Sequence, residues 1–261
     1  MEVATTNHYS LTSKQLAILN FIYRFRFITS DKLSKALNIT KTTTNKRLKL
    51  LLELKYIGRK YEPEDRISRK HAIYYLLPGG IAELKKVSKE QYLSKVFRNI
   101  RNDENASDQF IKHNLFVLDT YLQLRSMHGE DLQFFTATQM AAKSYFPKPL
   151  PDAHIQLGLD KPKLFLLEVL HENQPFFLAT RAIIRHIKYA QDGDWPSQYD
   201  FPKILLLCDS VSLQKRLLKK MRTRISESDS PKFYITGLEE LKNDIWQNMS
   251  DPDETLSLSQ I

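Results

Sequence analysis

Two carboxylates in the C-terminal half of the chain have the types and spacing of a metal site. Asp152 follows a proline, and Glu168 is the single charged residue in the apolar segment 164–170. Burying an unpaired carboxylate costs on the order of several kcal/mol, so Glu168 requires a compensating cation. A Mg²⁺ or Mn²⁺ ion shared with Asp152 would supply it. A basic side chain from the following segment, Arg181, Arg185 or Lys188, would do so equally well.

The segments that must position these carboxylates alternate between strand and helix patterns. Strands are predicted at 133–137, 153–159, 163–170, 204–208 and 232–235, and helices at 108–127, 180–190, 211–225 and 238–246. Nearly continuous apolar runs such as 163–170 are typical of strands that are buried on both faces. The pattern therefore predicts an α/β domain whose central mixed sheet is covered on both sides.

The first third of the chain has the element order of a winged helix-turn-helix. Apolar residues at helical spacing predict a helix over 13–25, a shorter helix that ends at Asn38, and a third helix that Thr40 caps and that runs to Leu54. Two strand-like segments, 56–61 and 72–77, flank the loop 62–71. In this arrangement the third helix is the recognition helix and the loop is the wing.

Polar and basic side chains cover the predicted outer face of the third helix and continue into the wing. Ammonium and guanidinium groups in such positions displace counterions from a phosphate backbone. The predicted DNA-binding residues are Lys41, Thr42, Thr43, Asn45, Lys46, Arg47 and Lys49 on the helix, with Arg66, Arg69 and Lys70 in the wing.

The positive charge of the chain is confined to this first third. Residues 1–90 carry 18 Lys and Arg against 8 Asp and Glu, whereas the remaining residues carry 21 against 22, which accounts for the net charge of +9. A localised positive field attracts a polyanion to one domain. It favours a DNA-binding surface over a protein-docking module, and the basic run 215–224 is interpreted as a solvated helix face.

Composition sets the remaining limits. We expect a winged-helix domain at 1–90, a polar linker at 91–107, an α/β domain at 108–249 and a disordered tail at 250–261. Neither a signal peptide nor an apolar run of membrane-spanning length is recognised. The single cysteine, Cys208, lies in an apolar strand and is expected to be an inert thiol in a reducing compartment. These features predict a cytoplasmic protein without a membrane partner.

The order of these motifs resembles the replication-relaxation family of plasmid and mobile-element proteins. A winged helix is followed by a linking helix with a histidine, a P-D-A motif, a strand with L-E-V, a helix with a K-Y pair and a G-x-W turn. The matching residues are Pro151, Asp152 and Ala153; Leu167, Glu168 and Val169; Lys188 and Tyr189; and Trp195.

The resemblance implies that the second domain is similar to the PD-(D/E)xK, restriction-endonuclease-like fold. In that fold an Asp and a Glu bind a metal, and a Lys two residues after the Glu helps to activate water. Here Leu170 stands at that position, and an apolar side chain cannot stabilise the developing charge. An active site would consist of Asp152, Glu168 and Lys188 with bound Mg²⁺ or Mn²⁺, and His171 is an alternative base. Without activity no cofactor is expected.

Three functions follow from these observations. The preferred one is a double-stranded DNA-binding protein that acts in replication, mobilisation or transcriptional control of a plasmid or mobile element, with an inactive nuclease-like domain. The alternatives are a metal-dependent endonuclease or nickase that uses Asp152 and Glu168, and a protein-interaction adaptor. Replication or relaxase proteins and a second copy of the chain are the candidate protein partners.

Overall fold

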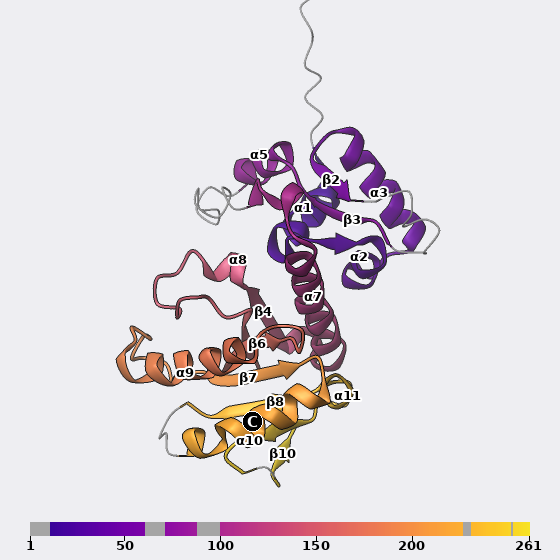
Figure 1. Ribbon diagram of the computed structural model, residues 1–261. Coiled ribbons are helices and arrows are strands. Elements are labelled where there is room, and N and C mark those ends of the chain that lie inside the picture. The colour runs from indigo at the N-terminus through magenta and orange to yellow at the C-terminus, as the bar shows by residue number, and fades with distance from the viewer. Residues whose placement is uncertain (1–10, 61–70, 88–99, 227–230, 252) are drawn as a thin grey trace, which may run out of the picture. The chain divides into compact units, whose positions relative to one another are not determined.

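The computed structural model divides the chain into two compact units, residues 1–107 and residues 108–261. It describes residues 11–60, 71–87, 100–226, 231–251 and 253–261 (Figure 1). In the described part of the chain, no helix combines the length and the apolar character needed to cross a membrane.

The first unit has the predicted winged-helix order. The elements are α1 (Ser13–Phe25), β1 (Ile28–Thr29), α2 (Ser30–Leu37), α3 (Lys41–Glu53), β2 (Ile57–Lys60), β3 (Ile73–Leu76), α5 (Pro78–Val87) and the 3-10 turn η1 (Asp103–Asn105). The three strands form one antiparallel sheet in the order β1-β3-β2. The chain reversal between β2 and β3 is the wing, most of which lies outside the described residues.

Short polar side chains set the boundaries of the first three helices. Thr12, Thr29 and Thr40 each accept a hydrogen bond from a backbone N–H in the first turn of the helix that follows. Asn38 adopts the left-handed conformation, with φ of 49°, which ends α2 and turns the chain into α3. The predicted caps of α2 and α3 are therefore confirmed, and the tight turn between these helices fixes the direction of α3.

Residues 100–107 belong to the first unit and are not a free linker. Ile100 and Asp103 are buried, and the Arg26 guanidinium donates hydrogen bonds to both carboxylate oxygens of Asp103. Burial raises the pKa of Asp103, an effect that Arg26 and Lys60 oppose. The predicted linker was therefore wrong over 100–107. Its polar residues include Asp103, which pairs with Arg26 at the end of α1. The rest of that linker, 91–99, lies outside the described residues.

The second unit is built on a seven-stranded mixed sheet with the order β10-β9-β8-β7-β6-β5-β4. Its strands are β4 (Leu132–Thr136), β5 (Ala153–Leu157), β6 (Lys163–Leu170), β7 (Lys203–Cys208), β8 (Phe233–Thr236), β9 (Trp246–Asn248) and β10 (Thr255–Leu256). β6, β7 and β8 are parallel, and the outer strands pair antiparallel. This sheet agrees with the predicted mixed α/β fold.

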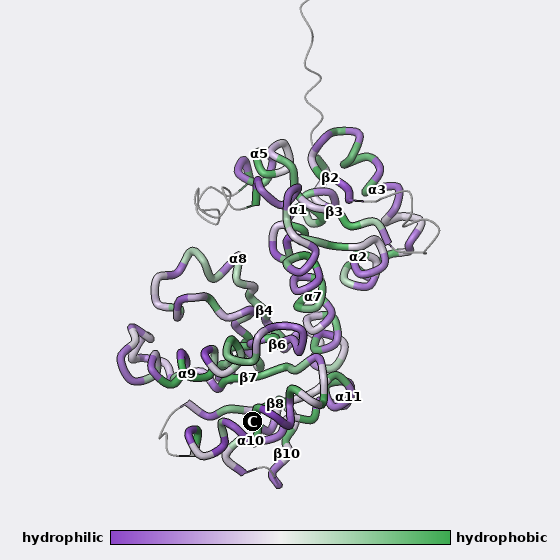
Figure 2. Tube along the Cα trace, in the orientation of Figure 1, coloured by the Kyte–Doolittle hydropathy of each residue, from purple (hydrophilic) through white to green (hydrophobic). Residues whose placement is uncertain are grey.

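Helices cover both faces of this sheet. They are α7 (Asp108–His128), the turn η2 (Gly129–Asp131), α8 (Ala137–Met140), α9 (Phe176–Asp192), α10 (Val211–Ser226) and α11 (Leu238–Leu241). α7 contacts β4 and β6, whereas α9 and α10 pack together and α10 also contacts β7 and β8. The interior strand β7 is apolar from Ile204 to Cys208 (Figure 2), and its Cys208 is buried, which raises the pKa of this thiol to about 12.

The C-terminal part of the chain corrects two predictions. The predicted helix 238–246 ends at Leu241, because Asp244 takes a positive φ and fully buried Trp246 begins β9. The predicted disordered tail instead contains β10, which pairs with β9, and Leu258 and Ile261 are buried. Isolated apolar residues in a polar segment are sufficient to attach it to an open sheet edge.

Candidate functional site

The predicted recognition helix presents a mixed polar and basic surface. Thr42, Asn45, Lys46 and Lys49 are exposed, and buried Leu48 and Leu51 fix the opposite face of α3 in the core. The helix therefore displays hydrogen-bonding groups of the kinds that read base edges and phosphates.

The remaining predicted DNA contacts divide into two groups. Lys41 forms an ion pair with Asp31 at 2.6 Å, which lowers the pKa of Asp31, and the hydroxyl groups of Thr43 and Thr40 lie 2.9 Å apart. Arg47 is half-buried. Arg66, Arg69 and Lys70 lie outside the described residues, so their predicted role in the wing stays a prediction.

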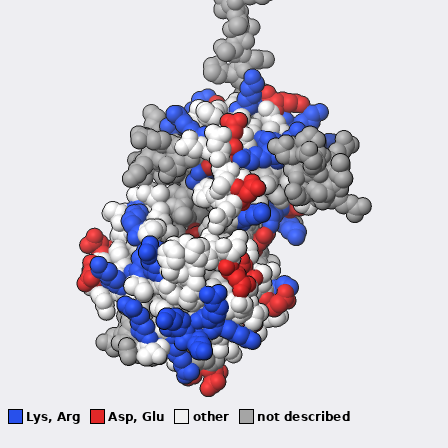
Figure 3. All heavy atoms as spheres, in the orientation of Figure 1, with Lys and Arg blue, Asp and Glu red and all other residues white. Residues whose placement is uncertain are grey.

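A second group of exposed basic side chains lies on α10 in the other unit. Figure 3 shows Lys and Arg gathered over this helix. The exposed members on α10 are Lys215, Arg216, Lys219, Lys220, Arg222 and Arg224. Because Arg216 also packs on the ring of Phe176, with its guanidinium carbon 4.4 Å from the centroid, this surface is in part structural.

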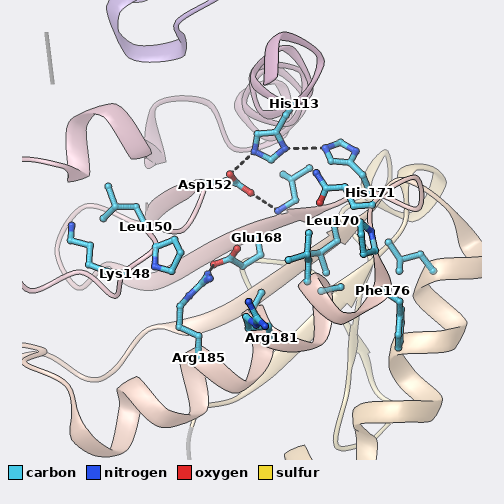
Figure 4. Close-up of a pocket in the computed structure, with 18 residues that line it drawn as sticks. His113, Lys148, Leu150, Asp152, Glu168, Leu170, His171, Phe176, Arg181 and Arg185 are labelled. Atoms are coloured by element: carbon cyan, nitrogen blue, oxygen red, sulfur yellow. Dashed lines mark hydrogen bonds and ion pairs between the residues drawn. The ribbon is translucent and has the colours of Figure 1, made fainter. Parts of the chain in front are cut away.

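The second unit contains a pocket at the carboxyl end of β6, lined by polar and apolar side chains (Figure 4). Its volume is about 480 Å³, and Asp152, Glu168, His113 and His171 line it together with apolar and basic side chains. The parallel pairing of β6 with β7 brings the residues that follow these strands to one edge of the sheet. This edge is where polar groups of an open α/β sheet converge.

Asp152 is held by two protein donors. One carboxylate oxygen accepts the backbone N–H of Val169 at 2.7 Å, and the other lies 2.7 Å from Nε2 of His113 on α7. The backbone of Asp152 also pairs with Leu167 and Ala137, so the residue is fixed where β5 begins. The carboxylate is therefore oriented by the sheet and by α7 without any metal.

A chain of hydrogen bonds continues from Asp152 through two histidines. His113 Nδ1 lies 3.0 Å from His171 Nε2, and His171 Nδ1 lies 3.0 Å from a carboxylate oxygen of Asp209. The other oxygen of Asp209 accepts the backbone N–H of Glu172 at 2.8 Å. The result is an Asp-His-His-Asp chain that joins α7 to the ends of β6 and β7.

The geometry of this chain requires one additional proton. If each imidazole donates to its carboxylate, the two facing nitrogens repel unless one of them is also protonated. Burial lowers the pKa of His113, but the hydrogen bond that it donates to Asp152 and the charges of Asp152 and Glu168 raise it, and the net shift is upward. The carboxylates thus favour an imidazolium at this position.

Glu168 is compensated by the protein itself. Its Oε1 atom contacts the guanidinium of Arg185 and lies 2.7 Å from Nε2 of His186, which is fully buried on α9. Arg185 was among the predicted compensating cations, whereas His186 was not. Both come from the turn of α9 that faces β6, so the ion pair ties the helix to the sheet.

Of the predicted catalytic residues, Lys188 does not join this cluster, whereas His171, the alternative base, is part of the hydrogen-bonded chain. Lys188 is exposed and lines an adjacent cavity of about 420 Å³ together with Arg181 and Arg185. Leu170 lines the Asp152 pocket at the position where the nuclease pattern has a lysine. Within the ranges that the structure describes, no group of three or more His, Cys, Asp or Glu residues could hold a metal ion.

Sequence reasoning missed Asp209 and His186. Asp209 directly follows the apolar strand β7, which is a position where the carboxyl end of a parallel strand delivers side chains to the site. His186 gave no comparable signal, because it sits in an ordinary amphipathic helix pattern and its partner is 18 positions earlier.

The sequence profile of the replication-relaxation family matches residues 19–196. The chain belongs to the replication-relaxation family. The match includes α3 and the helix α9 that carries Arg185 and His186, so the family extends over both units. The comparison with curated proteins finds no match.

Solved structures similar to this replication-relaxation protein include those of MarR and ZitR. A mutant MarR from E. coli in complex with operator DNA shares 19% identity over 43% of this chain and 76% of that chain, with a TM-score of 0.28. A ZitR mutant from Lactococcus lactis shares 22% identity over 46% and 76%, with a TM-score of 0.27. Another MarR structure shares 26% identity over 45% and 78%, with a TM-score of 0.29. With such low TM-scores, the fold assignment rests on the element order and pairing described above.

Replacing Arg185 with Met should destabilise this replication-relaxation protein by about 3 kcal/mol, because Glu168 loses a charged partner in a buried position. The matched control is Arg181→Met on the same helix, where an exposed arginine contacts the ring of Phe177 and a change below about 1 kcal/mol is expected. Urea unfolding followed by circular dichroism measures both. Adding Glu168→Gln to Arg185→Met should recover stability, and equal losses in the two arginine variants would contradict the assigned ion pair.

The pKa of His113 should lie above its usual value of 6.5 and should fall in Asp152→Asn. Because the folded pKa is raised, the associated stabilisation is complete below pH 6.5 and is lost as the pH rises through the folded pKa. NMR titration of the histidine ring, combined with unfolding at several pH values, tests both statements. A wild-type pKa below 6.5, or one that Asp152→Asn leaves unchanged, would contradict the hydrogen-bonded chain.

Proposed function

We propose that this chain binds double-stranded DNA through α3 of its first unit and acts in replication, mobilisation or transcriptional control of a plasmid or mobile element. The proposal is supported by four exposed polar side chains on α3, the second helix of the α2–α3 helix-turn-helix. They are Thr42, Asn45, Lys46 and Lys49. Most of the net charge of the chain also belongs to this unit. A polar helix of this kind fits the major groove, which admits an α-helix.

The second unit supports a binding or docking role in this proposal and does not cleave DNA. Glu168 is occupied by Arg185 and His186, and Asp152 by Val169 and His113. Leu170 stands at the position where the nuclease pattern has a lysine, and Lys148 is the lysine among the described residues that line this pocket. A cation that enters would share Glu168 with the guanidinium of Arg185, and the repulsion between these positive charges disfavours the metal-dependent chemistry considered from the sequence.

Lys46→Ala should weaken binding to a mixed-sequence duplex by about three- to tenfold and lower the slope of log K against log salt by about 0.9, as expected for one lost phosphate contact. Fluorescence anisotropy with a labelled duplex at several salt concentrations provides both quantities. Lys220→Ala on α10 removes the same charge from the other unit and serves as the matched control. Equal affinity and equal salt slope in Lys46→Ala and wild type would exclude α3 as the DNA-binding surface.

Purified wild-type protein should leave supercoiled plasmid intact in the presence of Mn²⁺, because its carboxylates already have protein partners. Gel electrophoresis after incubation with and without Mn²⁺ measures relaxed and linear products. Metal-dependent product that disappears in Asp152→Ala would establish the endonuclease and reject an inactive second unit. Product that persists in Asp152→Ala would indicate a contaminating nuclease and would leave the prediction standing.

A further inference from the structure

The second unit contains another cavity, which lies at the opposite end of strand β6 from the Asp152 pocket. It lies where β6 begins at Lys163 and β7 begins at Lys203, and its volume is about 800 Å³. The lining residues of the two cavities do not overlap. Ligand pockets for small molecules have volumes of roughly 300–1,000 Å³, so this cavity is large enough for a ligand of its own.

Aromatic rings form one side of this cavity. The ring centroid of Trp195 lies 5.5 Å from that of Tyr145 and 5.8 Å from that of Phe201, in edge-to-face contacts. The indole N–H of Trp195 donates to the backbone oxygen of Asp200 at 3.1 Å, which fixes the ring. Tyr199 adds a ring that is 56% exposed. Rigid rings that remain accessible are a platform for stacking a planar heterocycle.

A buried polar atom without a partner lies in the same lining. His154 is 6% exposed, and its Nε2 atom has no hydrogen bond within the described part of the chain. Burial lowers the pKa of His154 to about 4, so the ring is neutral near pH 7. An unsatisfied buried group of this kind costs about 1–3 kcal/mol, which a polar group of a ligand would offset. Gln156, two residues further along β5, also lines the cavity.

Positive charge gathers at the mouth of the cavity. Lys161, Lys163 and Lys203 line it, and Asp200 is the one acidic residue among the described residues of the lining. The ammonium groups of Lys163 and Lys203 donate to the backbone oxygens of Ser259 and Ile261, which leaves further N–H donors on each. Burial, together with the charges of Lys163 and Lys232, lowers the pKa of Lys203, so a bound anion would relieve this repulsion.

We propose that this cavity binds a nucleotide, with the base among Tyr145, Trp195 and Tyr199 and the phosphate on the three lysines. A nucleotide combines the three features that the cavity matches: a stacking ring, a polar ring edge for His154 and Gln156, and a negative charge. Free nucleotide and the end of a single DNA strand share this chemistry. The site lies wholly within the second unit and is independent of duplex binding by α3.

Tryptophan fluorescence of the full chain tests the site directly. The chain has two tryptophans, and Trp246 is fully buried in the sheet, so Trp246→Phe leaves Trp195 as the reporter. The ligands are AMP, dTMP, adenosine and a five-nucleotide dT strand. Saturable quenching is expected for the phosphorylated ligands, with adenosine at least about tenfold weaker because it lacks the charge that the lysines bind.

Charge variants separate this site from general electrostatic attraction. Two variants, Lys163→Ala and Lys161→Ala, should each weaken nucleotide binding by at least about fivefold. Lys161 is exposed, so its replacement does not challenge folding. Lys112→Ala, exposed next to His113 of the other cavity and outside this lining, should leave nucleotide binding unchanged. Quenching by mononucleotides identifies a free nucleotide as the ligand, and quenching by the strand alone identifies a strand end. Both outcomes support the site.

The proposal is overturned if no phosphorylated ligand quenches at millimolar concentration, or if Lys112→Ala weakens binding as much as Lys161→Ala does. Duplex affinity measured on the same variants keeps the two proposals distinguishable. Lys161→Ala should retain wild-type duplex binding, whereas Lys46→Ala should retain wild-type nucleotide quenching. Loss of both activities in both variants would also overturn the assignment of a separate nucleotide site.

Discussion

The buried carboxylate of Glu168 is the constraint on which the second unit depends. It lies in an interior strand, and the free energy cost of its charge is offset by Arg185 and His186 from one turn of α9. This contact fixes which face of α9 meets the sheet, and it leaves no requirement for a metal. The same electrostatic principle acts in the first unit, where Arg26 compensates buried Asp103 and attaches the segment after α5.

The two units differ in where they place their charged side chains. The first concentrates positive charge on a small winged helix, where α3 displays polar side chains to solvent. The second is nearly neutral and uses its charged residues internally, in the Glu168 ion pair and in the hydrogen-bonded chain from Asp152 to Asp209. The match to the replication-relaxation family over 19–196 includes both the polar face of α3 and the pocket that Asp152 and Glu168 line.

Local signals in the sequence predicted most of the fold. Thr40 and Asn38 act within a few residues, and the apolar run of β6 indicates its burial directly, so helices and interior strands could be placed. The site was less accessible because its partners are distant: His113 meets Asp152 across 39 positions. β9 and β10 were missed because they are short and polar, and their place depends on the free edge of β8. Tertiary contacts decide such segments.

Hydrogen–deuterium exchange of the full chain, measured with and without duplex DNA, shows which segments the DNA protects. It therefore tests whether DNA binds the first unit and leaves the Asp152 and Glu168 contacts of the second unit unchanged. We expect new protection in α3, over Lys41–Glu53, and unchanged exchange in the segments that contain Asp152 and Glu168. Protection confined to those two segments, with α3 exchanging as in the free protein, would contradict it.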